Sequence, residues 1–154
     1  MKKSEQTRQV IIRKSAGLFN QKGLAGTSMS DIMEATGLTK GGLYGNFKNK
    51  DEIAAAAFEY AVDFIWEEIG RRTKVIDHSL DKLKAVVYFY KEHLFNPPVK
   101  GGCPIMKTGA MSENLPIEMR AGVKRAITDW EDAIVKTLNR GKERKEVRKD
   151  VNCE

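Results

Sequence analysis

The residues from Thr27 to Lys50 constrain the fold of this chain more than any other stretch, because capping and stop signals divide them into short helices. Ser28 precedes an apolar-periodic run and Asp31 follows three positions later, which is the pattern of a capping box. Gly37 can adopt the left-handed backbone conformation that ends a helix. The stretch therefore predicts a short helix that begins at Met29, followed by a tight turn.

A second short helix is expected from Lys40 to Phe47, with Thr39 as its cap. Leu43 and Phe47 are four positions apart and so share its inward face. The opposite face carries Thr39, Lys40, Gly42, Tyr44 and Asn46. Two short helices joined by a tight turn form a helix-turn-helix, whose second helix has the size to enter the major groove of double-stranded DNA.

Three glycines in this second helix, Gly41, Gly42 and Gly45, each cost about 1 kcal/mol of helix propensity relative to alanine. Glycine instead permits close approach of the backbone, which a helix against a phosphate-lined groove can use. The alternative is a glycine-rich loop. Caps, periodicity and charge agree with one another and favour the helix.

Longer helices are expected on both sides of this stretch. The first, from Arg8 to Lys22, has apolar residues at helical spacing and ends at Gly23. After the stretch, Asn49 is expected to cap a helix with Glu52 at the capping-box position. That helix runs from Asp51 to about Lys74 and links the N-terminal part of the chain to the rest.

The net charge of +6 is confined to one part of the chain. Residues 1–50 hold nine lysines and arginines against three acids, whereas the remainder holds 18 basic and 18 acidic residues. Excess positive charge around a helix-turn-helix is the electrostatic footprint expected for phosphate binding. A basic N-terminus that is simply solvated would not explain why the excess stops at Lys50.

The rest of the chain is also predicted to be helical, which makes the fold class all-α. A helix from Leu80 to Phe95 is apolar on two faces, which indicates a position inside a bundle. A loop from Val99 to Pro104 leads to a short segment, Ile105 to Met111. A last helix opens at Leu115-Pro116 and ends near Gly141.

Two segments of the sequence resemble a known protein family. They are IIRKSAGLFNQKG, residues 11–23, and GTSMSDIMEATGLTKGGLYGNFKNKDEI, residues 26–53. Together they resemble the DNA-binding domain of TetR-type (TetR/AcrR) bacterial transcriptional regulators. The resemblance implies a three-helix DNA-binding head at residues 1–50 and a helical ligand-binding and regulatory body at residues 51–154.

The resemblance also assigns DNA contacts. Phosphate contacts are implied for Thr27, Tyr44 and Lys50, with Lys48 on the same basic surface. The groove-facing set is Thr39, Lys40, Gly41 and Gly42. At Gly45 and Asn46 family members often carry larger or aromatic side chains, so this chain departs from the pattern there.

By the same resemblance the chain is a repressor, a homodimer on a palindromic operator. A small, largely apolar effector in the body would release it by tilting the helix from Asp51 to Lys74. Candidate effector contacts are Phe64, Trp66, Tyr88, Phe89, Cys103, Ile105, Met106, Met111 and Trp130. The family ends in two more helices that form a dimer interface, so either the chain is truncated relative to the family or another surface pairs the subunits.

The cysteines and histidines fit no zinc-ligand spacing, and no metal or cofactor is expected. For Cys103 two interpretations stay open: a small, partly buried loop residue, or a thiol that senses oxidants or electrophiles. A rival function is an enzyme with Cys103 as nucleophile and His93 as base, although no oxyanion-stabilising group is visible. A third is a DNA-binding fragment or helical adaptor without effector control.

No apolar run approaches the ~18 residues that a membrane-spanning helix needs, and no signal-peptide pattern opens the chain. The sequence therefore predicts a cytoplasmic protein without a membrane partner.

Overall fold

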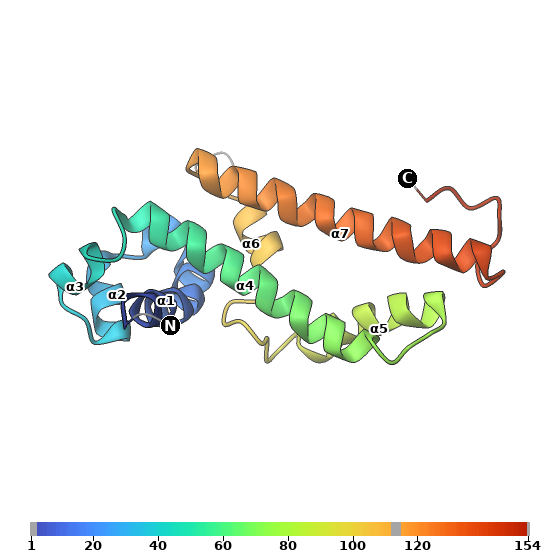
Figure 1. The fold of residues 1–154 in the computed structure, drawn as a ribbon, viewed down its shortest axis with the longest axis horizontal. Coiled ribbons are helices and arrows are strands. Elements are labelled where there is room, and N and C mark those ends of the chain that lie inside the picture. Colours follow the sequence, from blue (N-terminus) through green and yellow to red (C-terminus); the bar gives the residue numbers. More distant parts are fainter. Residues whose placement is uncertain (1–2, 112–114, 154) are drawn as a thin grey trace.

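The computed structural model describes residues 3–111 and 115–153, which form seven helices and no strand (Figure 1). The prediction of an all-α fold is confirmed. The helices are α1 (Lys3–Gly26), α2 (Met29–Thr36), α3 (Lys40–Tyr44), α4 (Lys50–Thr73), α5 (Ser79–Glu92), α6 (Pro104–Gly109) and α7 (Ile117–Glu143). None of the described helices is both long and apolar enough to cross a membrane.

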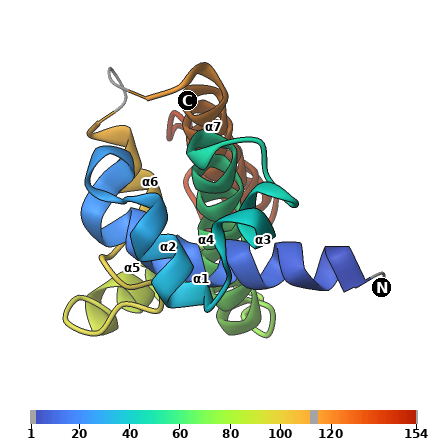
Figure 2. The same cartoon turned by 90° about the vertical axis from the view of Figure 1, so that its left-hand side faces the viewer.

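One helix, α4, connects the two ends of the molecule. We call α1, α2 and α3 the head, and α5, α6 and α7 the body. Figure 1 shows α4 running from the head along the long axis, with α7 beside it and α5 near its far end. Figure 2, seen from the head, shows α2 and α3 in front, with α1 crossing beside them. The domain boundary expected between residues 50 and 51 falls at the start of α4 and stays a prediction.

The head is held to α4 by a closely packed interface. Helix α1 contributes Ile11, Ala16 and Phe19 to this interface, and all three are buried. Helix α4 contributes Ala54 and Ala57, whose small side chains let the helix axes approach. Further along, α4 packs against α5, α6 and α7. The same helix is therefore part of both the head and the body.

Three of the differences from the prediction lie in the head and at the start of α4. Helix α3, expected to run to Phe47, ends at Tyr44, but Phe47 N–H still donates to Leu43 O at 3.0 Å, so the last turn is kept. Helix α1 starts earlier than expected, at Lys3, and continues past a break at Gly23, where φ is 72°. Glu52 accepts from the N–H of Lys48 at 2.8 Å rather than from that of Asn49, because the carboxylate reaches one residue further back.

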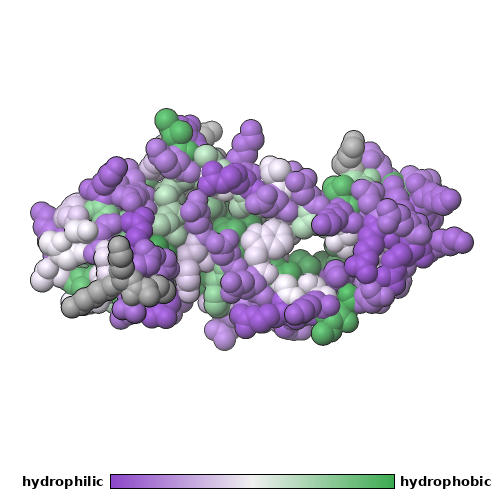
Figure 3. Space-filling view, viewed as in Figure 1, coloured by the Kyte–Doolittle hydropathy of each residue, from purple (hydrophilic) through white to green (hydrophobic). Residues whose placement is uncertain are grey.

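The prediction that the segment from Leu80 to Phe95 lies inside a bundle is wrong for part of it. Phe89 is buried, but Val87 is 67% exposed and Leu94 is 70% exposed. Helix α5 packs mainly on α4 and α7, and these exposed side chains lie outside that packing. Figure 3 shows hydrophobic side chains at the surface in this part of the molecule and over the start of α7.

The loop before α6 is clamped to α1 by a buried amide. Asn20 is 8% exposed, and its Nδ2 donates to the carbonyl oxygens of Lys100 and Gly102, both at 2.8 Å. Gly101 and Gly102 both have positive φ, at 97° and 95°. A Cβ on Gly101 would lie 2.7 Å from Asn20 O, whereas a Cβ on Gly102 would meet no atom within 4 Å. The backbone of the loop therefore rests directly on α1 at Gly101.

Gly101→Ala and Gly102→Ala form a matched pair that tests this contact. Each places a side chain at positive φ, which costs about 1 to 2 kcal/mol of the free energy of unfolding. Only the first adds a collision with the α1 backbone, so we expect it to be the more destabilising by a further ~1 kcal/mol or more. Urea unfolding followed by circular dichroism measures the difference, and equal losses would contradict the clamp.

Candidate nucleic-acid interface and ligand pockets

The first helix of the helix-turn-helix is fixed by its caps. Asp31 N–H donates to Ser28 Oγ at 3.1 Å, and Ser28 N–H donates to Asp31 Oδ2 at 2.7 Å, which completes the predicted capping box. Lys22 donates to Asp31 at 2.6 Å. These hydrogen bonds, with that from Lys22 the strongest, hold the pKa of the Asp31 carboxyl well below its usual range. Gly37 ends the helix with φ 73°, as predicted.

Helix α3 divides into a buried face and an exposed face. Leu43 is 0% exposed and Phe47 is 2% exposed, so both anchor the helix on the core as predicted. Thr39 caps the helix by accepting from Gly42 N–H at 3.3 Å. Several residues expected to meet DNA are exposed, namely Thr39, Lys40, Gly41, Tyr44 and Lys48. Gly42 is half-buried. The Lys40 ammonium lies 6.0 Å from the centre of the Tyr44 ring.

The position of α3 depends on Arg8, for which the sequence predicted only a contribution to the positive charge of residues 1–50. Its guanidinium donates to Asn46 O at 2.6 Å and to Glu52 Oε1 at 3.0 Å, and it lies 3.9 Å from the centre of the Phe47 ring. One side chain therefore ties the start of α1 to both the end of α3 and the start of α4. The hydrogen bond from Lys48 N–H, and then that from Arg8, lower the pKa of the Glu52 carboxyl.

Two of the residues expected to contact phosphates have partners inside the protein. Thr27 is 0% exposed, and its hydroxyl donates to Gly23 O at 2.8 Å. That hydroxyl is not available to a phosphate, which corrects the expectation for this side chain. Lys50 Nζ donates to Leu24 O at 2.8 Å and to Thr27 O at 2.9 Å. Two of the three ammonium donors of Lys50 thus close the link between α1 and α2.

Space around the glycines of α3 differs from one to the next. A Cβ on Gly41 would meet no atom of the protein within 4 Å. On Gly45 it would lie 3.2 Å from Gly41 O, which is tighter than ordinary packing. A side chain at position 45 would require the preceding turn to shift by a few tenths of an ångström. The fold does not require a small residue at position 41, which lies on the exposed face.

The residues expected to bind an effector do not line one cavity. Trp66, Cys103, Ile105 and Trp130 surround a cavity of about 10 Å³ between α4, α6 and α7. Ile105 and Trp130 also line an open hollow of about 930 Å³ along α6 and α7, together with Met106. Phe64 lies in a different hollow, beside α1. Tyr88 is 54% exposed and Phe89 is buried.

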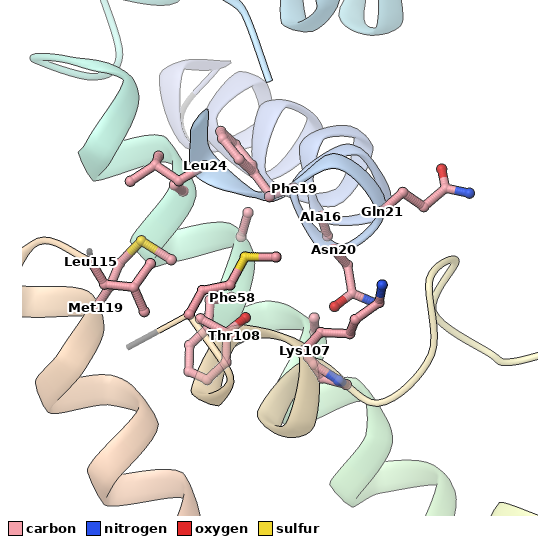
Figure 4. Close-up of a pocket in the computed structure, with 16 residues that line it drawn as sticks. Ala16, Phe19, Asn20, Gln21, Leu24, Phe58, Lys107, Thr108, Leu115 and Met119 are labelled. Atoms are coloured by element: carbon pink, nitrogen blue, oxygen red, sulfur yellow. The ribbon is translucent and has the colours of Figure 1, made fainter. Parts of the chain in front are cut away.

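Met111 lines a fourth space, between α1, α4, α6 and α7, with a volume of about 40 Å³. Figure 4 shows its two sides: Asn20, Gln21 and Lys107 lie on one, and Leu24, Leu115 and Met119 on the other. Sequence periodicity could not predict which of the nine candidate residues share a cavity. It marks each one as apolar or as part of a loop, but it does not show which helices pack together.

The side chains proposed for a cysteine enzyme have other neighbours. His93 Nδ1 lies 2.8 Å from Phe89 O, and its ring packs 4.6 Å from that of Phe89, measured between centroids. Cys103 lies next to Tyr90, whose pKa is raised by burial first and by Cys103 second. Nothing in this geometry pairs the Cys103 thiol with the His93 imidazole.

Two family models match the chain. Residues 11–57 match the model of bacterial regulatory proteins of the tetR family. Residues 79–154 match the tetracyclin repressor-like C-terminal domain.

Known proteins agree with these models. A TetR transcriptional regulator from Chloroflexus aurantiacus J-10-FL is 36% identical with a TM-score of 0.92, and the match covers 99% of this chain and 77% of that one. AcrR, an HTH-type transcriptional regulator from Shigella flexneri, is 31% identical over 85 residues, which is 54% of this chain and 40% of AcrR. The chain thus matches less than half the length of that curated relative.

A more distant structure shares the fold. AibR, solved in complex with isovaleryl coenzyme A and operator DNA, is 22% identical with a TM-score of 0.73 over 96% of this chain and 77% of AibR. The two family models and the close match to the Chloroflexus aurantiacus regulator show that the chain belongs to the TetR family of bacterial transcriptional regulators, which are not enzymes.

Proposed function

We propose that this protein binds a palindromic operator as a homodimer and regulates transcription, with α3 in the major groove. The observation that supports this is the division of α3 into two faces. Leu43 and Phe47 are buried, whereas Thr39, Lys40 and Gly41 are exposed at the N-terminal end. A helix anchored in this way presents its first residues outward, as a recognition helix does toward base edges.

Control by a small effector is the second part of the proposal. The cavity between Trp66, Cys103 and Trp130, of about 10 Å³, has room for about one water. An effector larger than water can enter this cavity only if α4 moves away from α6 and α7. Because α4 also packs on the head, such a displacement would bias the position of α3. AibR, which shares the fold, was solved with both an acyl-coenzyme A and operator DNA.

The alternative, a DNA-binding module or helical adaptor without effector control, predicts a different assembly. Light scattering at micromolar concentration measures the mass in solution. A dimer supports the proposal, because two recognition helices are needed for a palindrome. A monomer favours the alternative.

The operator is tested by selecting bound DNA from a random pool at fixed salt concentration. We expect enrichment of an inverted repeat with one fixed spacing, since the two-fold symmetry of a dimer imposes that arrangement. Recovery of sequences with no common half-site would contradict the proposal.

The substitution Gly41→Ala tests whether position 41 affects DNA binding without affecting the stability of the fold. Alanine should leave the free energy of unfolding unchanged or raise it by up to ~1 kcal/mol, because the added methyl meets no protein atom. The same methyl would stand between α3 and the groove, so we expect operator affinity to fall about tenfold.

Gly70→Ala is the matched control for that experiment. Gly70 is exposed on α4, and its Cβ would also meet no atom within 4 Å. It should show the same change in urea unfolding with no change in gel-shift affinity. An operator affinity for Gly41→Ala equal to that of the control would argue against α3 as the recognition helix.

Phosphate contacts and base contacts should respond differently to substitution. We expect Lys48→Gln to reduce by about 1 the slope of log affinity against log salt concentration, with unchanged sequence preference. Tyr44→Phe should weaken binding to all sequences alike, whereas Lys40→Gln or Thr39→Ala should also alter the preferred half-site. Fluorescence anisotropy across a salt series makes the measurement. Lys74→Gln, beyond the end of α4, is the control, and a slope change as large there would contradict the assignment.

A further inference from the structure

A hollow of about 430 Å³ lies beside α1, where residues between Arg13 and Gln21 line it. We call it the α1–α4 hollow. The head contributes Arg13, Lys14 and Ala35, and α4 contributes Tyr60 and Phe64. The body side contributes residues 98–100 of the loop before α6. Its volume is within the range of small-molecule sites, about 300 to 1,000 Å³.

The rim of the hollow carries positive charge that no acid balances. Arg13, Lys14 and Lys100 line it, and all three are exposed. Its lining contains no aspartate or glutamate. In the part of the chain that the structure describes, none of the three cations forms an ion pair, unlike Arg8 and Lys22. An anion in the hollow would therefore meet cations that have no competing carboxylate.

Two of the residues that line the hollow are aromatic. Tyr60 and Phe64 are one helical turn apart on α4, with ring centres 6.2 Å apart and planes inclined by 22°. Both are half-buried, so each offers part of a ring to the hollow. Flat apolar groups stack favourably on such rings. The hollow thus combines an apolar surface with a cationic rim, which is the complement of an amphipathic anion.

The backbone of one of the three cationic residues, Lys100, is fixed by hydrogen bonds. The carbonyls of Lys100 and Gly102 accept from Asn20 Nδ2, and Val99 beside them is 7% exposed. Lys100 is therefore placed against α1 before any ligand arrives, and less conformational freedom is lost on binding.

We propose that the α1–α4 hollow binds an organic anion with a flat apolar body, such as an aromatic carboxylate. The carboxylate would lie at the rim between Lys14 and Lys100, and the ring system would lie over Tyr60 and Phe64. The site is separate from the cavity around Trp66 and Trp130, and it does not depend on operator binding. Because its walls come from both the head and the body, a ligand in it contacts both.

The test uses 2-naphthoate and its neutral isostere 2-naphthamide as probes, on the full chain without DNA. Isothermal titration calorimetry gives both dissociation constants. We expect the wild-type protein to bind the carboxylate about tenfold more tightly than the amide, because only the carboxylate gains charge-assisted hydrogen bonds. The double variant Lys14→Gln/Lys100→Gln should lose that difference and keep the affinity for the amide.

The control is Lys74→Gln/Lys136→Gln, which removes the same net charge from exposed positions outside the hollow. It should keep the preference for the carboxylate within about twofold. The proposal is overturned if the two probes bind wild type equally, if both double variants lose the preference to the same extent, or if 2-naphthoate does not bind at millimolar concentration. Since no DNA is present, these outcomes leave the operator proposal to its own experiments.

Discussion

The structure depends on the close packing of α1 against the alanine-rich first half of α4. Ala54 and Ala57 are almost fully buried, and their small side chains allow Ile11 and Phe19 of α1 to fill the space between the helices. A larger residue at either alanine would push the axes apart, since interiors are packed too densely to absorb it. This contact fixes the head on a helix that continues into the body, so both parts share one rigid element.

Polar groups in the head are used mainly to position α3. Arg8 joins the ends of three helices, and Lys50 and Thr27 satisfy carbonyl groups where α1 gives way to α2. Charge counted along the sequence therefore overstates the charge that is free to meet DNA. Lys40 and Lys48, which project from the exposed side, are the cations best placed on the proposed interface.

Local signals were sufficient to predict much of this fold. Ser28, Gly37 and Asn49 mark helix ends through contacts within a few residues, and such contacts are encoded in the sequence itself. The inward direction of Leu43 and Phe47 followed from their spacing. The roles of Arg8 and Lys50 could not be predicted, because their partners lie more than twenty residues away. The exposure of α5 and the separation of the body hollows likewise depend on which helices become neighbours.

The open space beside Gly41 affects how the DNA-binding preference of such a regulator can change during evolution. Position 41 is on the surface proposed to read DNA, yet the protein's own packing places no steric limit on its side chain. Mutations there can explore new binding preferences without first repairing the core. At position 45 a Cβ would lie 3.2 Å from Gly41 O, so a side chain fits there only if the preceding turn shifts slightly. Altered promoter choice would thus arise more readily at the beginning of α3 than at its end.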